Sequence, residues 1–370
     1  MKIACDREKF LNAYQIVAGV APTRSPKAIL NNVKLDARGE RAVLMATDSE
    51  ASIRLELEDI EIQTPGVALL PVQRVASILR ESNEDRLTFE VTESSLDISG
   101  ANSEYHLPNI NPDEFPTVQS FSETAYYEVN ARLFKELVKR TVFATDVEST
   151  RYQLGGVLFE MDGENITTVA TDGRRLACMA GKGVTVGEYK GSGNSTIVPT
   201  KTLQLMERSI LDSDETVHIA ARSNDIVIQT KRCTLFSHLV EGRYPNWRQV
   251  MPSREGRTRI EGLVGPYFAA IRQAAIVADT ESRGVEFNFT PGNLTVSARA
   301  ADKGQSRIEI PITYDGEPIA ITMDYRFVQD FFRVLDPDMQ FAVEVRSNAE
   351  PALFTTEDGF SYVVMPMARQ

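Results

Sequence analysis

Apolar and polar residues follow the same order in three separate stretches of the chain, 29–53, 153–179 and 283–308. Each stretch holds an apolar strand, a turn, a second apolar strand and a polar turn that contains an aspartate. The three aspartates are Asp48, Asp172 and Asp302. They recur at the spacing of a whole domain, roughly 100–150 residues, rather than at the shorter period of a solenoid. The pattern therefore predicts three tandem copies of one domain.

Helix-like apolar spacing accompanies every copy of the strand pair. One amphipathic segment precedes it and a second follows a further strand; these segments are 6–17, 74–81, 131–143, 200–211, 266–278 and 324–335. Alternating strands then close each copy, over 86–99, 216–230 and 339–356. Each copy reads as two β-α-β-β-β halves. We therefore predict an α+β fold with antiparallel sheets, each covered on one face by helices.

Polar, charged stretches separate the copies. The segment 253–262 is rich in charge and glycine, as linkers between domains tend to be, and 119–126 is the corresponding joint after the first copy. We predict three domains, over 1–124, 125–253 and 254–370.

Composition limits the class of protein. The chain has 370 residues, of which 42% are hydrophobic and 25% charged, and no apolar run reaches the length that spans a bilayer. The N-terminus reads as a strand entering a helix, without the apolar core of a signal peptide. The chain has three cysteines, an odd number, and they lie far apart in the sequence, which indicates a reducing compartment. We expect a cytoplasmic protein with no membrane contact.

Charge is distributed unevenly. The six predicted helices hold 13 Lys and Arg against 7 Asp and Glu, while the whole chain has a net charge of −12. If the helices share one surface, that surface is positive on an otherwise acidic protein, as a lining that faces phosphates would be. Lys and Arg also favour helices for their own sake, so the pattern by itself leaves both explanations open.

The turn after the second strand of the middle copy reads ATDGRRLA, over 170–177. Its Thr-Asp pair recurs as Thr47–Asp48, where no arginines follow, so we interpret the aspartate as a cap of its own turn. Arg174 and Arg175 belong to the middle copy alone and could bind an anion. The motif has neither the glycines nor the lysine of a P-loop.

Two further segments carry apolar residues in unusual places. The loop 239–252 gathers Tyr244, Pro245 and the only tryptophan, Trp247, although the first copy has a similar Phe-Pro pair in 111–118. The chain ends on Met-Pro-Met, 365–367, which only the last copy carries. Such residues on loops and ends are typical of binding surfaces, or of a linker packed on its own domain.

Catalytic chemistry finds little support. No Ser-His-Asp or Cys-His arrangement can be assembled from motif context, and the three histidines have no metal-ligand spacing. We predict no catalytic residue, no cofactor and no metal site.

Taken together, ATDGRRLA, IVPTKTLQLM, LVEGRYPNWRQVMP and the terminal YVVMPM make the chain resemble the bacterial DNA polymerase III beta subunits, the sliding clamps. The resemblance covers the full length. It implies two chains joined head to tail in a ring, with helices lining a hole for double-stranded DNA and sheets outside. It also implies a non-catalytic processivity factor that a clamp loader opens and that tethers the replicative polymerase catalytic subunit. Other clamp-motif proteins of repair and replication control would bind the same pocket.

The resemblance assigns residues by position. The partner-peptide pocket would comprise Leu154, Thr171, Gly173, Arg174, Arg175, Leu176, Pro245, Gln249, Val250, Val363, Val364, Met365, Pro366 and Met367. DNA contacts would come from Arg24, Arg80, Tyr152, Gln153 and Lys201. The dimer contact would use Leu107, Ile276 and Val277.

The chain departs from the family's best-known member at several of these places. Arg174 stands for a histidine, Gln249 for an arginine and Gln153 for a tyrosine; Glu148 replaces a glutamine, and Ala368 precedes the terminal arginine. We expect a more basic pocket rim and altered DNA contacts. Two other functions stay open at this point: a peptide-binding scaffold without a DNA role, and an enzyme that acts on phosphates through 171–175.

Overall fold

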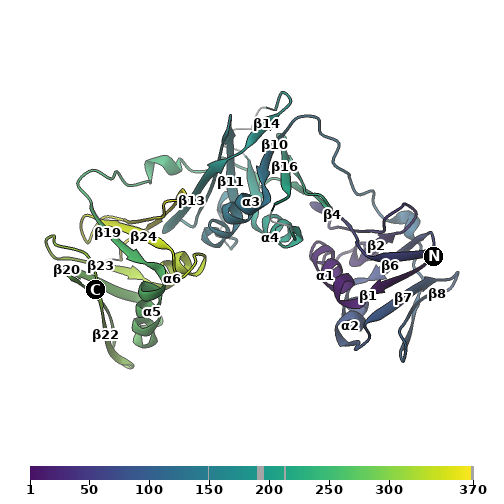
Figure 1. Cartoon of the computed structure of the whole chain (residues 1–370), viewed down its shortest axis with the longest axis horizontal. Helices are drawn as coiled ribbons and strands as arrows, with labels where there is room; N and C mark the ends of the chain where they lie inside the picture. Colours follow the sequence, from purple (N-terminus) through teal and green to yellow (C-terminus); the bar gives the residue numbers. More distant parts are fainter. Residues whose placement is uncertain (149, 190–195, 212–213, 368–370) are drawn as a thin grey trace. The chain divides into compact units, whose positions relative to one another are not determined.

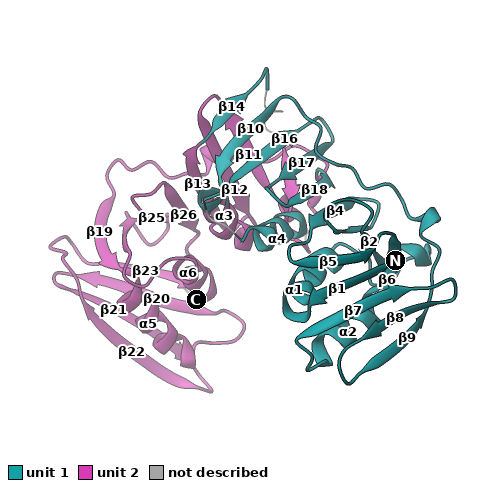
Figure 2. Cartoon of the chain, turned by 45° about the vertical axis from the view of Figure 1, so that its right-hand side comes forward, with its two compact units in different colours: residues 1–134, 183–192, 201–239 teal, residues 135–182, 193–200, 240–370 magenta. Residues whose placement is uncertain are grey.

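The computed structural model describes residues 1–148, 150–189, 196–211 and 214–367. Ala368 and the terminal arginine therefore lie outside the described residues. Contacts divide the chain into two compact units (Figure 2). Unit 1 comprises 1–134, 183–192 and 201–239, and unit 2 comprises 135–182, 193–200 and 240–370. The division passes through the middle repeat, inside its first helix.

Each sequence repeat contains the predicted order β-α-β-β-β, β-α-β-β-β, and the first and second repeats add one short strand between the two halves, β5 and β14 (Figure 1). The first contains β1 (Lys2–Asp6), α1 (Arg7–Ala18), β2 (Asn32–Asp36), β3 (Val43–Thr47), β4 (Ala51–Glu56), β5 (Ile60–Thr64), β6 (Val67–Pro71), α2 (Val72–Glu81), β7 (Arg86–Val91), β8 (Ser95–Ser99) and β9 (Glu104–Pro108). The second contains β10 (Tyr126–Asn130), α3 (Ala131–Lys139), β11 (Gly156–Asp162), β12 (Asn165–Thr171), β13 (Arg175–Lys182), β14 (Val184–Val186), β15 (Ile197–Pro199), α4 (Thr200–Ser209), β16 (Thr216–Ala221), β17 (Asp225–Gln229) and β18 (Cys233–His238). The third contains β19 (Thr258–Leu263), α5 (Val264–Ala274), β20 (Gly284–Thr290), β21 (Asn293–Ala300), β22 (Gly304–Pro311), β23 (Ile319–Asp324), α6 (Tyr325–Arg333), β24 (Gln340–Val345), β25 (Ala352–Thr355) and β26 (Phe360–Val364).

The strands form four antiparallel sheets, two in each unit. Unit 1 has the orders β5-β1-β7-β8-β9 and β14-β10-β16-β17-β18-β4-β3-β2-β6; unit 2 has β15-β11-β12-β13-β26-β25-β24-β19 and β22-β21-β20-β23. The two long sheets each join strands of two repeats, through β18 beside β4 and β26 beside β13. In both joints, the last strand of one repeat pairs with the strand that ends the first half of another.

All six predicted helices are present, but two of them end four residues earlier than the sequence predicted. The helix expected over 131–143 stops at Lys139, and the chain continues as a 3-10 turn over Val142–Ala144. The hydroxyl of Thr141 donates to the carbonyl of Leu137 at 2.6 Å and so occupies an acceptor near the helix end. Likewise α5 ends at Ala274, whose carbonyl accepts a bond from Ser306, before a 3-10 turn over Ala275–Val277.

The predicted aspartate-capped turns are confirmed in the first two repeats. Asp48 accepts from the N–H groups of Glu50 and Ala51, and Asp172 accepts from those of Arg174 and Arg175. The third repeat turns differently, because Ala300 pairs with Gly304 across three residues that include Asp302, whereas four residues separate the last pair in the other two repeats. No described helix is long and apolar enough to cross a membrane.

Candidate functional site

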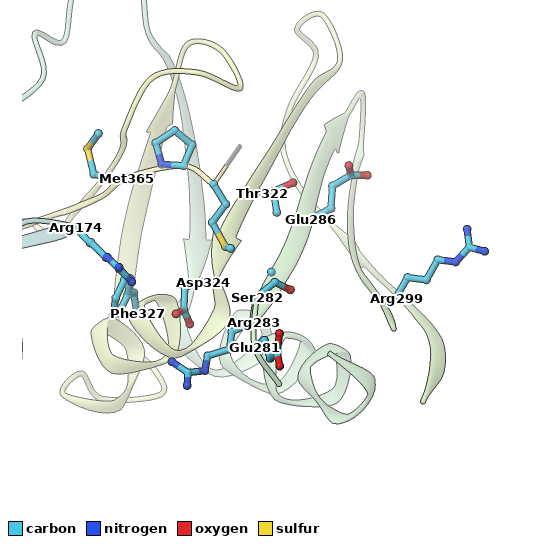
Figure 3. A pocket seen from close by; sticks show the side chains of 13 residues that line it. Arg174, Glu281, Ser282, Arg283, Glu286, Arg299, Thr322, Asp324, Phe327 and Met365 are labelled. Atoms are coloured by element: carbon cyan, nitrogen blue, oxygen red, sulfur yellow. The ribbon is translucent and has the colours of Figure 1, made fainter. Parts of the chain in front are cut away.

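A groove of about 860 Å³ lies in unit 2, where the chain's last described residues pass the third repeat (Figure 3). It is lined by Arg174, Glu281, Ser282, Arg283, Gly284, Glu286, Arg299, Thr322, Asp324, Phe327, Met365, Pro366 and Met367. The structure thus brings together four of the residues predicted for the partner pocket, namely Arg174, Met365, Pro366 and Met367.

Backbone hydrogen bonds fix the C-terminal segment against this groove. β26 pairs with β13 as far as Val364, and the N–H of Met365 then donates to the carbonyl of Arg174 at 2.9 Å. Two residues later, the N–H of Met367 donates to the carbonyl of Thr322 on β23 at 2.8 Å. The segment therefore bridges two sheets in an extended conformation, and the Met365 side chain is 41% exposed. Flexible thioether side chains at such a position suit ligands of varied shape.

Several residues predicted for the pocket form its supporting core instead of its surface. The apolar side chains of Leu154, Leu176, Val363 and Val364 are buried, and Thr171 is nearly so. Leu176 and Val363 belong to one cluster with Leu158, Val169, Cys178, Ile197, Tyr244 and Leu353. Because these side chains bury their apolar surface against one another, they expose no apolar surface to a ligand in this structure.

Arg175 has the most constrained side chain in the predicted set. The side chain is 10% exposed, and its guanidinium pairs with Asp172 at 2.9 Å and with Asp330 of α6 at 2.6 Å. It also donates to the carbonyl of Phe143 at 2.7 Å and lies over the ring of Phe327. With its donors committed to these partners, Arg175 positions the turn and α6, whereas the Arg174 side chain is exposed. The sequence did not separate the two arginines, because Asp330 and Phe327 come from another repeat.

The loop 239–252 is held on its own repeat. Tyr244 is buried in the apolar cluster, and that burial raises the pKa of its hydroxyl. The indole N–H of Trp247 and the guanidinium of Arg248 both donate to Glu160, at 3.3 and 2.7 Å. The linker interpretation therefore accounts for the aromatic residues of the loop. Pro245, Gln249 and Val250 stay exposed, and Val250 is 49% accessible.

The groove also has residues that the sequence did not indicate. Phe327 and Asp324 come from the start of α6, and Glu281, Ser282 and Arg283 precede β20 (Figure 3). Phe327 stood in a predicted amphipathic helix, where an aromatic residue usually belongs to the core. Arg283 has a left-handed φ of 58°, which is uncommon outside glycine and could have been found only from the backbone.

The candidate DNA contacts are surface residues of their own elements. Arg24, Arg80 and Lys201 are exposed, and Tyr152 is 77% exposed in a 3-10 turn beside the half-buried Gln153. Lys201 opens α4 and lies 3.6 Å from Asp48 of the first repeat's turn. The other exposed basic residues of the helices are Lys9, Arg74, Arg132, Lys139, Arg208, Arg272 and Arg333.

The candidate dimer contacts lie at or beside free sheet edges. Leu107 is half-buried on β9, the last strand of its sheet. In the 3-10 turn after α5, Ile276 is 77% exposed and Val277 is half-buried. The hydroxyl of Ser306, on the edge strand β22, donates to the carbonyl of Ala274 directly before this turn. An apolar side chain as exposed as Ile276 beside an unpaired strand is typical of a surface that another chain covers.

Reactive and metal-binding groups find no support in the described part of the chain. No three His, Cys, Asp or Glu residues there are grouped to hold a metal ion. Cys5, Cys178 and Cys233 are all buried, and burial raises the pKa of each thiol to about 12. Their sulfurs therefore stay protonated and unreactive at neutral pH.

Comparisons with known proteins cover the whole chain. Family models of the DNA polymerase III beta subunit match its N-terminal domain at residues 1–119, its central domain at 128–246 and its C-terminal domain at 248–368. The beta sliding clamps of Pseudomonas putida and Caulobacter vibrioides are each 28% identical to it, over 99% of this chain and 100% of theirs.

Solved structures agree with these matches over the full length of both chains. The DNA polymerase III subunit beta of Pseudomonas aeruginosa has a TM-score of 0.84 at 27% identity. A sliding clamp of the same organism, bound to griselimycin, has a TM-score of 0.86 at 26% identity.

Proposed function

The chain belongs to the DNA polymerase III beta subunit family, and from this premise we propose that it works as a sliding clamp. It is a non-catalytic processivity factor of DNA replication, built from three copies of the clamp domain. Two chains close a ring around duplex DNA, and the ring tethers the replicative polymerase and other clamp-motif proteins. We propose domains at 1–124, 125–253 and 254–370, and the cytoplasm as the compartment.

The pattern of strand joints is the observation that carries ring closure. Within the chain, β18 pairs with β4 and β26 pairs with β13, so the last strand of a repeat meets the fourth strand of the one before it. Two of the described strands have no such partner within the chain: β9, the last strand of the first repeat, and β22, the fourth strand of the third. Each is an edge strand of its sheet. Pairing β9 of one chain with β22 of a second uses both edges twice and closes a head-to-tail dimer, which leaves no free end.

Side-chain burial specifies the register of this proposed joint. On β9 the half-buried residues are Tyr105 and Leu107, and on β22 they are Ser306, Ile308 and Ile310. Opposite residues of an antiparallel pair face the same side of the sheet. The two half-buried rows therefore belong on one face, where Ile276 adds its exposed side chain.

Replacement of Leu107 by Asp tests the joint. We expect the variant to sediment as a monomer, because a carboxylate on the covered face of the joint would be desolvated without a partner. Val184→Asp is the control, since Val184 is an exposed apolar residue on the edge strand β14. A Leu107→Asp chain that remains as dimeric as the control would contradict closure through β9.

DNA inside the ring would be held by diffuse attraction to phosphates from Arg24, Arg80 and Lys201, with Tyr152 and Gln153 beside them. Neutralising the three basic residues should reduce the salt dependence of DNA binding by about three phosphate contacts. Arg38, Lys182 and Lys231 are also exposed and, when neutralised together, control for net charge. An unchanged salt slope would favour the alternative, a peptide-binding scaffold without a DNA role.

Partner proteins would dock a short segment in the groove that Arg174 and Met365–Met367 line, and the exposed residues Pro245, Gln249 and Val250 would extend the contact surface. Apolar side chains anchor such a segment, and the exposed backbone fixes its direction. Deletion of residues 365–370 should abolish polymerase binding while the dimer persists, as measured by sedimentation of mixtures. A deletion that yields monomers would assign the segment to the fold instead.

A further inference from the structure

The first strand of the third repeat has an open edge that the other two repeats cover. β1 lies between β5 and β7, and β10 lies between β14 and β16. β19 occupies the same place in its repeat, yet among the described residues it pairs only with β24 and ends its sheet, at the margin of unit 2 (Figure 2). An unpaired strand edge offers a row of N–H and C=O groups to any extended chain.

The chain's own connection leaves this edge free. In the first repeat, residues 57–66 link the two halves and supply β5 on the way. The corresponding connection of the third repeat, 312–318, is shorter and takes another course. Ile312 donates to the carbonyl of Gly292, and Gly292 donates back to that of Tyr314. These bonds hold the connection at the β20–β21 turn, so it supplies no strand beside β19.

A buried hydroxyl group lies against the same strand. Tyr267 of α5 occupies the position that Phe10 has in α1 and Phe134 has in α3, four residues after the strand ends. Its ring packs against Phe341 and so closely over Gly262 that a Cβ there would meet it at 2.5 Å. The side chain is 94% buried, and its hydroxyl has no hydrogen-bond partner among the described residues. Phe10 and Phe134, at the same position in the other repeats, have no hydroxyl to pair.

We propose that the edge of β19 is a second docking site, which takes an extended segment of a partner protein as an added antiparallel strand. The covered repeats indicate the segment's chemistry. In the first repeat, Ile62 lies opposite Ile3 and Ile60 lies opposite Cys5, with the exposed Glu61 between them. The partner segment therefore alternates apolar and polar residues, with the apolar ones opposite Ile260 and Gly262. A polar group of the segment satisfies the Tyr267 hydroxyl.

A peptide with the sequence of residues 58–66 is the probe. We expect it to bind the full-length chain without DNA, measured by fluorescence anisotropy up to millimolar concentration. Hydrogen exchange should show slowed amides in 258–263 and unchanged amides in β1 and β10, whose edges are filled. Binding with no protection of 258–263 would overturn the proposal, as would the absence of binding.

Two changes distinguish strand addition from a general apolar contact. Peptides N-methylated on alternate residues block one hydrogen-bonding edge each, so one set should bind and the other should not; equal binding of both sets contradicts strand pairing. Tyr267→Phe restores the residue type of the other repeats. It should weaken the peptide roughly three- to ten-fold, the effect of one lost hydrogen bond. If the affinity for the peptide were unchanged, the Tyr267 hydroxyl would not be part of the docking site. The clamp proposal stands or falls separately, because none of these measurements involves DNA or the groove beside Met365.

Discussion

The two joints between repeats, β4 with β18 in unit 1 and β13 with β26 in unit 2, share one backbone design and differ in their side chains. In both, a Thr-Asp turn precedes the joint. The hydroxyl of Thr47 donates to the carbonyl of Ala51, and that of Thr171 donates to the carbonyl of Arg175. Even the third turn residue matches, since Ser49 and Gly173 have left-handed φ angles of 82° and 89°.

At the turn end, charge is buried in the joint of unit 2 and exposed in the joint of unit 1. In unit 2, Arg175 pairs with Asp330 near one end, and Arg140, whose side chain is 7% exposed, pairs with Asp358 near the other. In unit 1, Ala51 occupies the place of Arg175, and the ion pair at the turn joins Asp48 to Lys201, which is 59% exposed. This difference in the burial of charge indicates that the two joints have different functions. We propose that the joint of unit 2 supports the groove beside it, and that the joint of unit 1 leaves Lys201 exposed for contact with phosphates.

Removal of Arg175 should give the largest effect. Arg175→Ala leaves Asp330 and Asp172 without their buried partner, and we expect the free energy of unfolding of unit 2 to fall by about 3–5 kcal/mol. Denaturant unfolding, followed by hydrogen exchange in β13 and β26, measures it. Arg333→Ala removes the exposed partner of the same Asp330 and should cost less than about 1 kcal/mol. Similar losses for both variants would mean that burial does not distinguish the joints.

The second ion pair of this joint should make unit 2 sensitive to acid. Burial raises the pKa of Asp358, but hydrogen bonds from Thr356 and Arg140 outweigh it and hold that pKa below its ordinary value. Because the pKa of Asp358 is lower in the folded protein than in the unfolded chain, its ionised form stabilises the fold. This stabilisation is complete above the pKa of the unfolded chain and is lost as the pH falls through the pKa of the folded protein. Unit 2 should therefore lose stability below about pH 4. Arg140→Ala should be less stable at neutral pH and show a shallower loss on acidification; an unchanged slope would contradict this role.

Substitutions at the third residue of the two turns should change the stability of the protein in opposite directions. Gly173→Ala places a side chain at φ 89°, and we expect a loss of about 1–2 kcal/mol. Ser49→Gly relieves the same conformation in unit 1 and should gain up to about 1 kcal/mol. Thermal unfolding of the two variants measures these changes. If both variants lost or both gained stability, the two turns would not be equivalent.

Lys201→Ala should have the smallest effect on stability. Its ion pair is exposed, so the free energy of unfolding should change by less than about 0.5 kcal/mol. DNA binding should weaken, with a salt slope lower by about one. If stability falls and the slope does not, the lysine belongs to the joint and not to a DNA surface.

The sequence predicted what each repeat determines locally. Strand pairs, six helices and the Thr-Asp turns follow from short-range patterns, and the structure has them all. β5 and β14 were missed, although the Ile-Glu-Ile alternation of β5 was readable, because both are short edge strands added to the repeated pattern and the described part of the third repeat has neither. The strand joints and the Arg175 pair could not be predicted, since their partners come from distant repeats and are specified only by the folded chain.

The C-terminal segment shows how a repeat can be hidden. Met365–Met367 looked unique to the last copy, but the N–H of Val240 donates to Ile197 as that of Met367 donates to Thr322. Both segments leave a last strand and bond to the strand that precedes a second helix. The backbone path is therefore repeated, and only the side chains are new. After Val240 the chain continues into the loop that buries Tyr244, whereas beside Met367 the groove remains open.

Retention on closed DNA tests the central claim most directly. The chain would be placed on nicked circular DNA by a clamp loader and followed by gel filtration at a salt concentration that removes non-specific binders. The account predicts that it stays with the circles and is released when one cut makes them linear, because enclosure, unlike phosphate attraction, is not screened. Equal loss from circular and linear DNA would contradict the ring.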